Sequence, residues 1–391
     1  MLHFEEALEI VLTNVEPTDT MRVSMMSALN RILAEDLISD IDMPPFNKAA
    51  MDGFACRRQD LKALLEVIEE IPAGATPLKK IGPGQCSRIM TGAPVPEGAD
   101  FILMKEYAVT AEDDKIICTK ELASDNICLR GEDVKQGDVV LTKGTLLKSQ
   151  HIAILASVGC TEPLIYEAPT VAVFSTGNEL VEPAHKPESS KIRNSNGYQI
   201  MAQCIQMGLS PEDLGIVPDD EVELTHLLSE AIHKYDIVLM SGGVSVGDYD
   251  YVPGVLKKLG VDIRIHGIQA KPGKHMLFGR KDNHFIVGLP GNPVSSFVQL
   301  EILVKPLVQK LIGQEPQHIT LHVPLNESYK RKKDDVLAFV PVQFTDDGSV
   351  KPLEYHGSAH IHAYVNANGI MEMPIGITEY KKGDIVRVRP L

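Results

Sequence analysis

The stretch from Ser241 to Val252 combines glycines, hydroxyls and acids in a spacing that could bind an anion with the help of a metal ion. It follows the short apolar run 236–240, which is typical of a buried strand, and precedes 253–260, which a proline opens and a glycine closes like a short helix. Backbone N–H groups at such a turn can approach an anionic ligand closely. Asp248 and Asp250 suit this loop if a divalent cation lies between acid and anion. The alternative is a solvated loop in which Asp250 caps the next helix.

The chain around this stretch alternates short buried runs with segments of helical spacing. The apolar runs predict strands at 170–175, 214–217, 236–240, 263–266 and 285–287. The amphipathic segments predict helices at 196–208, 221–235, 253–260 and 293–312. Such alternation predicts a parallel, doubly wound sheet with helices on both faces. Pro306 is expected to kink the last helix, because proline lacks the N–H that an inner helical turn needs.

The turns that follow these strands hold most of the residues that could bind a ligand. They lie at 176–179, 219–220, 241–250 and 288–293. Ligands of doubly wound sheets bind at the carboxyl ends of the strands, so these turns are expected to share one edge. Asp219 or Asp220 could equally cap the helix 221–235, and Pro290 and Pro293 could serve only to start the helix that follows.

The rest of the chain predicts further domains, since 391 residues exceed the usual size of one core. Residues 2–15 have the apolar stripe of a helix, and Pro44-Pro45 forces an extended connection. Runs that favour strands, rich in nearby glycine and proline, predict a small β domain before the sheet and another after it. The expected domains are an N-terminal region of 1–45 with 137–166, a β domain of 46–136, an α/β domain of 167–313 and a C-terminal β domain of 314–391.

Composition narrows the class of protein. The net charge of −15 argues against general nucleic-acid binding and requires any anionic substrate to meet a local cluster of cations, amides or metal. No segment approaches the roughly 18 apolar residues of a membrane span, and the first residues do not resemble a secretory signal. We therefore expect a soluble, cytoplasmic protein. Its 6 cysteines form no C-x-x-C pair, which favours reduced structural thiols.

One polar cluster lies in the C-terminal part, where His356, His360 and His362 follow Tyr355. Three histidines so close could bind a metal ion. We interpret them as a loop instead, because no nearby acid or cysteine completes a ligand set.

Ordered motifs along nearly the whole chain resemble those of the molybdopterin molybdenumtransferases, the molybdenum insertases called MoeA in bacteria and the E domain of gephyrin in animals. They are Pro44-Pro45-Phe46 with Ala50-Met51-Asp52-Gly53, 90–96, Arg130-Gly131-Glu132-Asp133, 174–180, 241–251, Lys271-Pro272-Gly273-Lys274 and 288–293. A single Ser-Gly-Gly loop would be a weak signal, whereas this ordered set is a specific one.

The resemblance implies a multidomain α/β and β fold. Its parts would be a central doubly wound molybdopterin-binding domain like that of the partner adenylyltransferase, an inserted β-rich domain, an elongated N-terminal linker region and a small C-terminal β-barrel. It also implies a homodimer in which the β domain of the second subunit completes the cleft. The implied reaction inserts molybdate into adenylylated molybdopterin, with Mg²⁺ as the cation and AMP as the released product. A molybdopterin adenylyltransferase would donate the substrate.

The resemblance also carries roles onto individual residues. It implies catalytic roles for Asp52, Thr91, Glu179 and Asp250, of which Glu179 and Asp250 would hold the metal. It implies substrate binding by Arg130, Asp133, Asp219, Ser241, Gly242, Gly243, Ser245, Lys271, Lys274, Pro290, Pro293 and Ser358. Asn178 departs from the family, in which many members have aspartate there, and so removes one potential metal ligand.

The chemistry of these residues fits the implied reaction. Pyrophosphate and molybdate are multiply charged, and Lys271 and Lys274 supply the local positive charge that the acidic chain otherwise lacks. No Ser-His-Asp or Cys-His arrangement stands out, which favours direct attack by water or by a molybdate oxygen. Two rivals remain: a Mg-dependent molybdopterin adenylyltransferase and a non-catalytic molybdopterin-binding scaffold. The long N-terminal half argues against the first, and the retained acids and lysines argue against the second.

Overall fold

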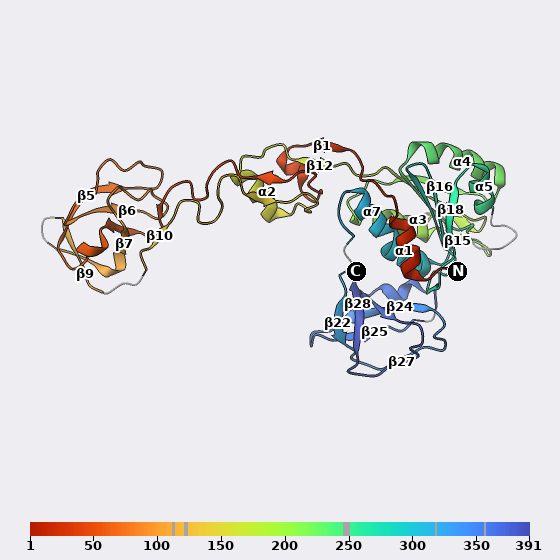
Figure 1. Ribbon diagram of the computed structural model, residues 1–391. Coiled ribbons are helices and arrows are strands. Elements are labelled where there is room, and N and C mark those ends of the chain that lie inside the picture. Colours follow the sequence, from red (N-terminus) through yellow and green to blue (C-terminus); the bar gives the residue numbers. More distant parts are fainter. Residues whose placement is uncertain (112–113, 121–123, 245–250, 317–318, 356) are drawn as a thin grey trace. The chain divides into compact units, whose positions relative to one another are not determined.

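The chain divides into two units in the computed structural model, which describes residues 1–111, 114–120, 124–244, 251–316, 319–355 and 357–391 (Figure 1). Unit 1 comprises Met1–Arg22, Asn30–Ala34 and Leu164–Leu391, and unit 2 comprises Val23–Leu29 and Glu35–Pro163. The predicted N-terminal segment 1–45 is therefore shared between them. No helix in the described part of the chain is long and apolar enough to span a bilayer.

A six-stranded sheet forms the centre of unit 1, in the order β16-β13-β17-β21-β20-β18. Its strands are β13 (Val171–Thr176), β16 (Glu212–Val217), β17 (Ile237–Ser241), β18 (Asp262–His266), β20 (Leu277–Lys281) and β21 (His284–Leu289). Strands β16, β13, β17 and β21 pair in parallel, as the alternation of strands and helices predicts. Strand β20 was not predicted and runs antiparallel to both neighbours. The sheet is therefore not wholly parallel, because a tight hairpin at Asp282-Asn283 reverses the chain after β20.

Helices cover both faces of this sheet because its strands are apolar on both sides. Val171 and Val173 pack with helices α1 (Phe4–Leu12), α3 (Ser195–Gln206), α6 (Pro293–Gln299) and α7 (Lys305–Leu311). Ala172 and Phe174 point to the other face and pack with α4 (Glu221–Lys234) and α5 (Val252–Lys258). This arrangement confirms the doubly wound α/β domain. The predicted disturbance at Pro306 appears as a π-helical segment, Leu300–Val304, that separates α6 from α7.

The C-terminal β domain of unit 1 is a second six-stranded sheet. Its strands are β19 (Ala270–Lys271), β22 (Leu321–Pro324), β24 (Leu337–Phe344), β25 (Val350–Pro352), β26 (Gly369–Met373) and β28 (Ile385–Pro390). Strand β19 comes from the loop before β20 of the α/β domain and pairs in parallel with β24. The short strands β23 (Tyr329–Lys330) and β27 (Glu379–Tyr380) pair beside this sheet. The predicted C-terminal β domain is thus confirmed, and it shares the Lys271 segment with the α/β domain.

Unit 2 contains the other predicted β domain, a six-stranded sheet in the order β7-β4-β6-β5-β9-β8. Its strands are β4 (Gly53–Cys56), β5 (Leu65–Ile71), β6 (Gln85–Ile89), β7 (Phe101–Met104), β8 (Ala108–Thr110) and β9 (Lys115–Cys118). Beside it, β3 (Lys48–Ala49) pairs with β10 (Ile127–Cys128), and β2 (Leu37–Ile38) pairs with β11 (Val139–Leu141). Helix α2 (Ser149–Ser157) completes the unit. The six cysteines, all among the described residues, form no disulfide with one another.

Candidate active site

The exits of three neighbouring strands lie level with one another in unit 1. The register pairs Ser175 of β13 with Ser241 of β17, and Ser241 with Leu289 of β21. The turns that follow these residues therefore leave the same edge of the sheet, which confirms their expected convergence. We call this edge the strand-exit site.

Two asparagines before and in helix α3 join these turns. Asn194 caps the helix by accepting the N–H of Gly197, and its side chain also accepts the hydroxyl of Ser175 at 2.9 Å. Asn196 is buried, and its Nδ2 donates to Ser241 Oγ at 2.7 Å and to the Gly291 carbonyl at 2.8 Å. Asn196 thus ties the Ser-Gly-Gly turn to the turn after β21. Sequence reasoning missed both residues, although two asparagines at a helix start are a capping signal.

The turn after β17 requires glycine. Gly242 and Gly243 have φ of +96° and +64°, in the left-handed region that side chains disfavour. A Cβ at Gly242 would lie 2.3 Å from the carbonyl oxygen of Thr176, so the ends of strands β13 and β17 could not lie as close together as they do. Ser245, Asp248 and Asp250 follow this turn but lie outside the described residues.

The two adjacent aspartates after β16 accept hydrogen bonds from different parts of the domain. Asp220 is the N-cap of α4 and accepts the N–H groups of Val222 and Glu223. Asp219 instead accepts the hydroxyl of Thr176 at 2.7 Å and the N–H of Asn178 at 3.3 Å. The structure therefore assigns the cap to Asp220 and places the carboxylate of Asp219 beside the end of β13.

The turn after β13 holds Asn178 and Glu179, both of them exposed. Asn178 returns the contact with Asp219, because its Oδ1 accepts the N–H of Asp219 at 3.3 Å. The Glu179 carboxylate folds over Gly177, with Oε2 2.7 Å from the position that a Cβ there would take. The oxygens of Asp219 already accept hydrogen bonds, so the exposed Glu179 is the carboxylate of this turn that could hold Mg²⁺, an ion that uses one or two carboxylates beside substrate phosphates.

The segment after β21 contacts the C-terminal domain. Asn292 Nδ2 donates to Ser358 Oγ at 3.0 Å, and the Val294 N–H donates to the Ser358 carbonyl at 3.0 Å. Pro290 is buried at the end of β21, and Pro293 is the first residue of α6. Ser358 therefore lies at the strand-exit site, beside the turn that Asn196 holds.

Lys271 and Lys274 lie on the loop between the α/β domain and the C-terminal sheet. Both are exposed, and the described residues include no ion-pair partner for either of them. Pro272 and Gly273 between them are buried. Both ammonium groups are therefore accessible, and their role in binding an anion stays a prediction.

In unit 2, Asp52 accepts three hydrogen bonds. Thr91 gives two of them to Oδ1, from its N–H at 2.8 Å and its hydroxyl at 2.7 Å, and Lys105 Nζ lies 3.3 Å from Oδ2. These bonds, those of Thr91 first, lower the pKa of Asp52 to about 2. Asp52 is therefore a fixed negative charge at neutral pH and a poor proton acceptor. Lys105 is the member of this group that sequence reasoning missed, and we call the three residues the Asp52 cluster.

The Arg130 motif meets the same segment of chain. The Arg130 N–H donates to Asn47 Oδ1 at 2.8 Å, and its Nε pairs with Asp42 at 2.6 Å. The N–H of Gly92, beside Thr91, donates to the Ala49 carbonyl at 2.8 Å. Asp133 is exposed, and its N–H donates to the Met43 carbonyl. The three motifs of the β domain thus converge on residues 42–52.

Replacing Thr91 with valine should raise the pKa of Asp52 from about 2 toward its ordinary value of 3.8. Valine keeps the backbone N–H bond and loses the hydroxyl bond, so the rise should be partial. Because the pKa is lowered in the folded state, ionised Asp52 stabilises that state above pH 3.8, and this contribution is lost as the pH falls toward 2. NMR titration of the Asp52 carboxyl carbon measures the change. An unchanged midpoint in Thr91→Val would mean that the hydroxyl does not act on Asp52.

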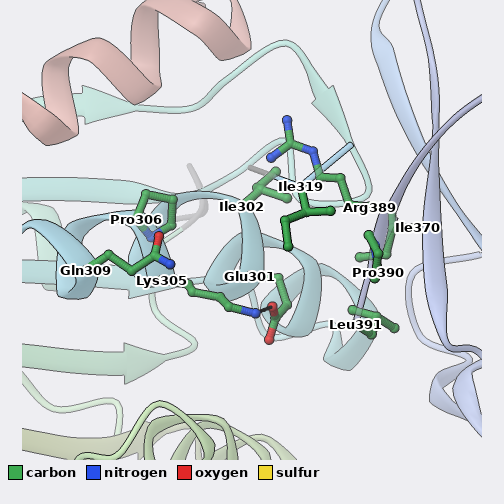
Figure 2. Close-up of a pocket in the computed structure, with 10 residues that line it drawn as sticks. All are labelled: Glu301, Ile302, Lys305, Pro306, Gln309, Ile319, Ile370, Arg389, Pro390 and Leu391. Atoms are coloured by element: carbon green, nitrogen blue, oxygen red, sulfur yellow. Dashed lines mark hydrogen bonds and ion pairs between the residues drawn. The ribbon is translucent and has the colours of Figure 1, made fainter. Parts of the chain in front are cut away.

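Neither the histidines nor the cavity beside α7 forms a second site in the described residues. His360 and His362 are exposed, His356 lies outside the described part, and no group of three potential metal ligands occurs within it. A cavity of about 190 Å³ lies between α7 with its π-helical segment and strands β26 and β28 (Figure 2). Its charged side chains have ion-pair partners: Lys305 pairs with Glu301 at 2.9 Å, and Arg389 pairs at 2.5 Å with Glu372, which does not line the cavity. None of the predicted site residues lines it.

Comparison with known proteins covers almost the whole chain. Three family models match in order: the MoeA N-terminal region (domain I and II) at 2–159, the probable molybdopterin binding domain at 172–310 and the MoeA C-terminal region (domain IV) at 323–391. The molybdopterin molybdenumtransferase of Haemophilus influenzae is 36% identical, over 100% of this chain and 98% of that protein. The enzyme of the same name from Staphylococcus epidermidis is 34% identical, over 98% and 94%.

Solved structures agree with these matches. The crystal structure of the molybdopterin biosynthesis moeA protein from Pyrococcus horikoshii covers 100% of both chains with a TM-score of 0.87 and 29% identity. The similarity to curated relatives exceeds 30% identity over nearly the full length, and the three domain matches follow one another along both units. The chain therefore belongs to the molybdopterin molybdenumtransferase family.

Proposed function

We propose that this protein is a molybdenum insertase, a transferase that inserts molybdate into adenylylated molybdopterin and releases AMP and molybdenum cofactor. The observation that carries the proposal is the strand-exit site, where Ser241, Gly242 and Asn196 build one edge of the molybdopterin-binding domain. Backbone N–H groups and hydroxyls at such an edge suit a pterin phosphate.

The cations that an oxyanion needs are Lys271 and Lys274. In a chain of net charge −15, two exposed lysines without carboxylate partners in the described residues are a local site for molybdate or pyrophosphate. Ser358, which is held against Asn292, adds a hydroxyl near the same helix start. These residues bind and orient the two anionic substrates, which places the reacting groups for attack.

Asp52 acts as a charge and not as a base. Its pKa of about 2 keeps the carboxylate ionised, and Thr91 fixes its direction. Covalent catalysis by Cys56, Cys86 or Cys204 is disfavoured, because burial raises the pKa of each of these thiols to about 12. Direct attack by water or by a molybdate oxygen on the phosphate remains the simplest route.

Magnesium would be held by the exposed carboxylate of Glu179, with Asp250 as the second proposed ligand. Asp219 is less available, since Thr176 and Asn178 already occupy its oxygens. When bound, the metal neutralises negative charge on the phosphate oxygens. We further propose a homodimer in which the second subunit's β domain brings its Asp52 cluster to the strand-exit site, and a molybdopterin adenylyltransferase as the substrate donor.

The proposed function is tested by molybdate-dependent release of AMP from adenylylated molybdopterin, followed by chromatography of the nucleotide. Release that requires both molybdate and Mg²⁺ would support it. Formation of adenylylated product from ATP and molybdopterin would instead identify an adenylyltransferase. Pterin binding without either reaction would identify a scaffold.

Asn178→Asp should tighten Mg²⁺ binding, so that the release of AMP needs a lower Mg²⁺ concentration. The aspartate keeps an oxygen that can accept the Asp219 N–H, and it adds a carboxylate beside Glu179. A further carboxylate should lower the Mg²⁺ concentration at half-maximal rate by about three- to tenfold. Asn178→Ala is the control that removes the oxygen without adding charge. A shift in the opposite direction in Asn178→Asp would show that this corner does not bind the metal.

A further inference from the structure

A fully buried glutamine of helix α6 contacts the Lys271–Lys274 loop. Gln299 is 0% exposed, and its Nε2 donates to the Pro272 carbonyl oxygen at 3.1 Å. Gly273 has a φ of +104°, and a Cβ built on it would lie 2.3 Å from the same Nε2. The middle of the loop therefore packs directly on the amide of Gln299, in a backbone conformation that favours glycine.

This amide is an unusual choice for a core position. Within the described residues, Gln299 Oε1 is buried without a hydrogen-bond partner, and so is Ser296 Oγ one turn earlier on the helix. Buried polar groups are normally hydrogen-bonded, and an aliphatic side chain would fill the position without an unpaired oxygen. The bond that Gln299 makes to Pro272 is the feature that such a side chain could not replace.

The ends of the loop are fixed by other contacts, and its centre is fixed by Gln299. Lys271 belongs to β19 and pairs with Ala338, while the Lys274 carbonyl accepts the Ile268 N–H at 2.9 Å. Between them Pro272 and Gly273 are buried and the two lysine side chains are exposed. The direction in which the lysines leave the loop thus depends on how the central dipeptide lies against Gln299.

Helix α6 also links this loop to the strand-exit site. Asn292 stands before its first residue and Gln299 is its last, a separation of about 10 Å along a helix axis. We propose that Gln299 is a positioning residue that holds Lys271 and Lys274 for an oxyanion substrate. The identity of the oxyanion rests on the proposed function. That Gln299 fixes the position of the loop rests on the structure alone.

Whether Gln299 fixes the position of the loop is tested by amide hydrogen exchange of the whole protein. Gln299→Met, which keeps the length and volume but cannot donate, should speed exchange of the amides in 271–276 by about tenfold or more. Strands β17 and β21 should exchange as in the wild type. Gly273→Ala disturbs the same contact from the loop side and should act alike. The matched control is Ser296→Ala, which removes the other unpaired oxygen of this helix and should leave the loop unchanged.

The consequence for binding is tested by equilibrium dialysis with molybdate alone. Gln299→Met should weaken molybdate binding by about tenfold while the thermal midpoint stays near that of Ser296→Ala. In the Lys271→Met/Lys274→Met background, Gln299→Met should have no further effect, since the lysines through which it acts are absent. A general defect of the fold would weaken residual binding in both backgrounds.

If the amides of the loop exchange at the wild-type rate in both Gln299→Met and Gly273→Ala, the inference is wrong. It is also wrong if Gln299→Met weakens molybdate binding further in the Lys271→Met/Lys274→Met background. If exchange of the loop amides rises as expected but the wild type binds no molybdate, the proposed oxyanion site is wrong, whereas the role of Gln299 in fixing the loop is supported.

Discussion

Asp52→Asn is expected to lower molybdate-dependent AMP release by about a hundred- to a thousandfold while leaving the fold intact. Asparagine keeps an oxygen that can accept both bonds from Thr91, so the loop should hold its shape. What it loses is the charge, which the low pKa of Asp52 maintains at every pH at which the enzyme would work. Rates at saturating substrate, compared with those of wild type, measure the effect.

Asp60→Asn is the matched control for this substitution. Asp60 is a carboxylate of the same unit that pairs with Arg57 at 3.5 Å and accepts the Gly84 N–H, and no motif includes it. Its replacement should leave AMP release within about twofold of wild type. If Asp52→Asn retained full activity, the Asp52 cluster would not be part of the catalytic site.

Mixing two inactive variants tests whether Asp52 acts across the proposed dimer. When Asp52→Asn subunits are refolded with an equal amount of Glu179→Ala subunits, half of the dimers are mixed. If the β domain of one subunit serves the strand-exit site of the other, each mixed dimer has one intact site, and about a quarter of wild-type activity should return. If each site takes both residues from one subunit, no activity returns.

The sequence predicted five of the six strands of the central sheet, but not which of two adjacent polar residues makes which contact. Strand and helix periodicity predicted the edge at which the turns meet. Asp219 and Asp220 could not be distinguished, because the choice depends on backbone angles at the start of α4. Asp220 has the extended conformation of a cap, with φ −131° and ψ 129°, which leaves Asp219 to accept from Thr176.

Contacts distant in sequence were also beyond prediction. Asn196 reaches Ser241 and Gly291, and Gln299 reaches Pro272, so each amide acts on loops that no local pattern connects to it. Strand β20 is a different case, since the Asp282-Asn283 turn that pairs it with β21 is a recognisable hairpin signal. Only Leu277 and Phe278 of this strand are large apolar residues, and a run so short does not indicate a strand by itself.

Gly242→Ala is expected to weaken substrate binding at the strand-exit site strongly. The alanine would sit at a φ of +96° with its Cβ 2.3 Å from the Thr176 carbonyl oxygen, which is backbone and cannot move aside as a side chain would. Relief of the clash requires β13 and β17 to separate at their ends, which displaces the Ser241 hydroxyl from Asn196. We expect the free energy of unfolding to fall by about 1–3 kcal/mol and the affinity for adenylylated molybdopterin to fall by about a hundredfold or more.

Gly291→Ala separates this clash from the general effect of adding a methyl group at the same edge. A Cβ added to Gly291 would meet no atom of the described residues within 4 Å, and the residue has no positive φ, yet its carbonyl accepts from the same Asn196. Its alanine variant should therefore bind substrate within about threefold of wild type and unfold at the same denaturant concentration. Urea unfolding and titration of pterin fluorescence measure both variants. Equal losses in the two would mean that any side chain at this edge blocks the ligand, and that the close approach of β13 and β17 is not what shapes the turn.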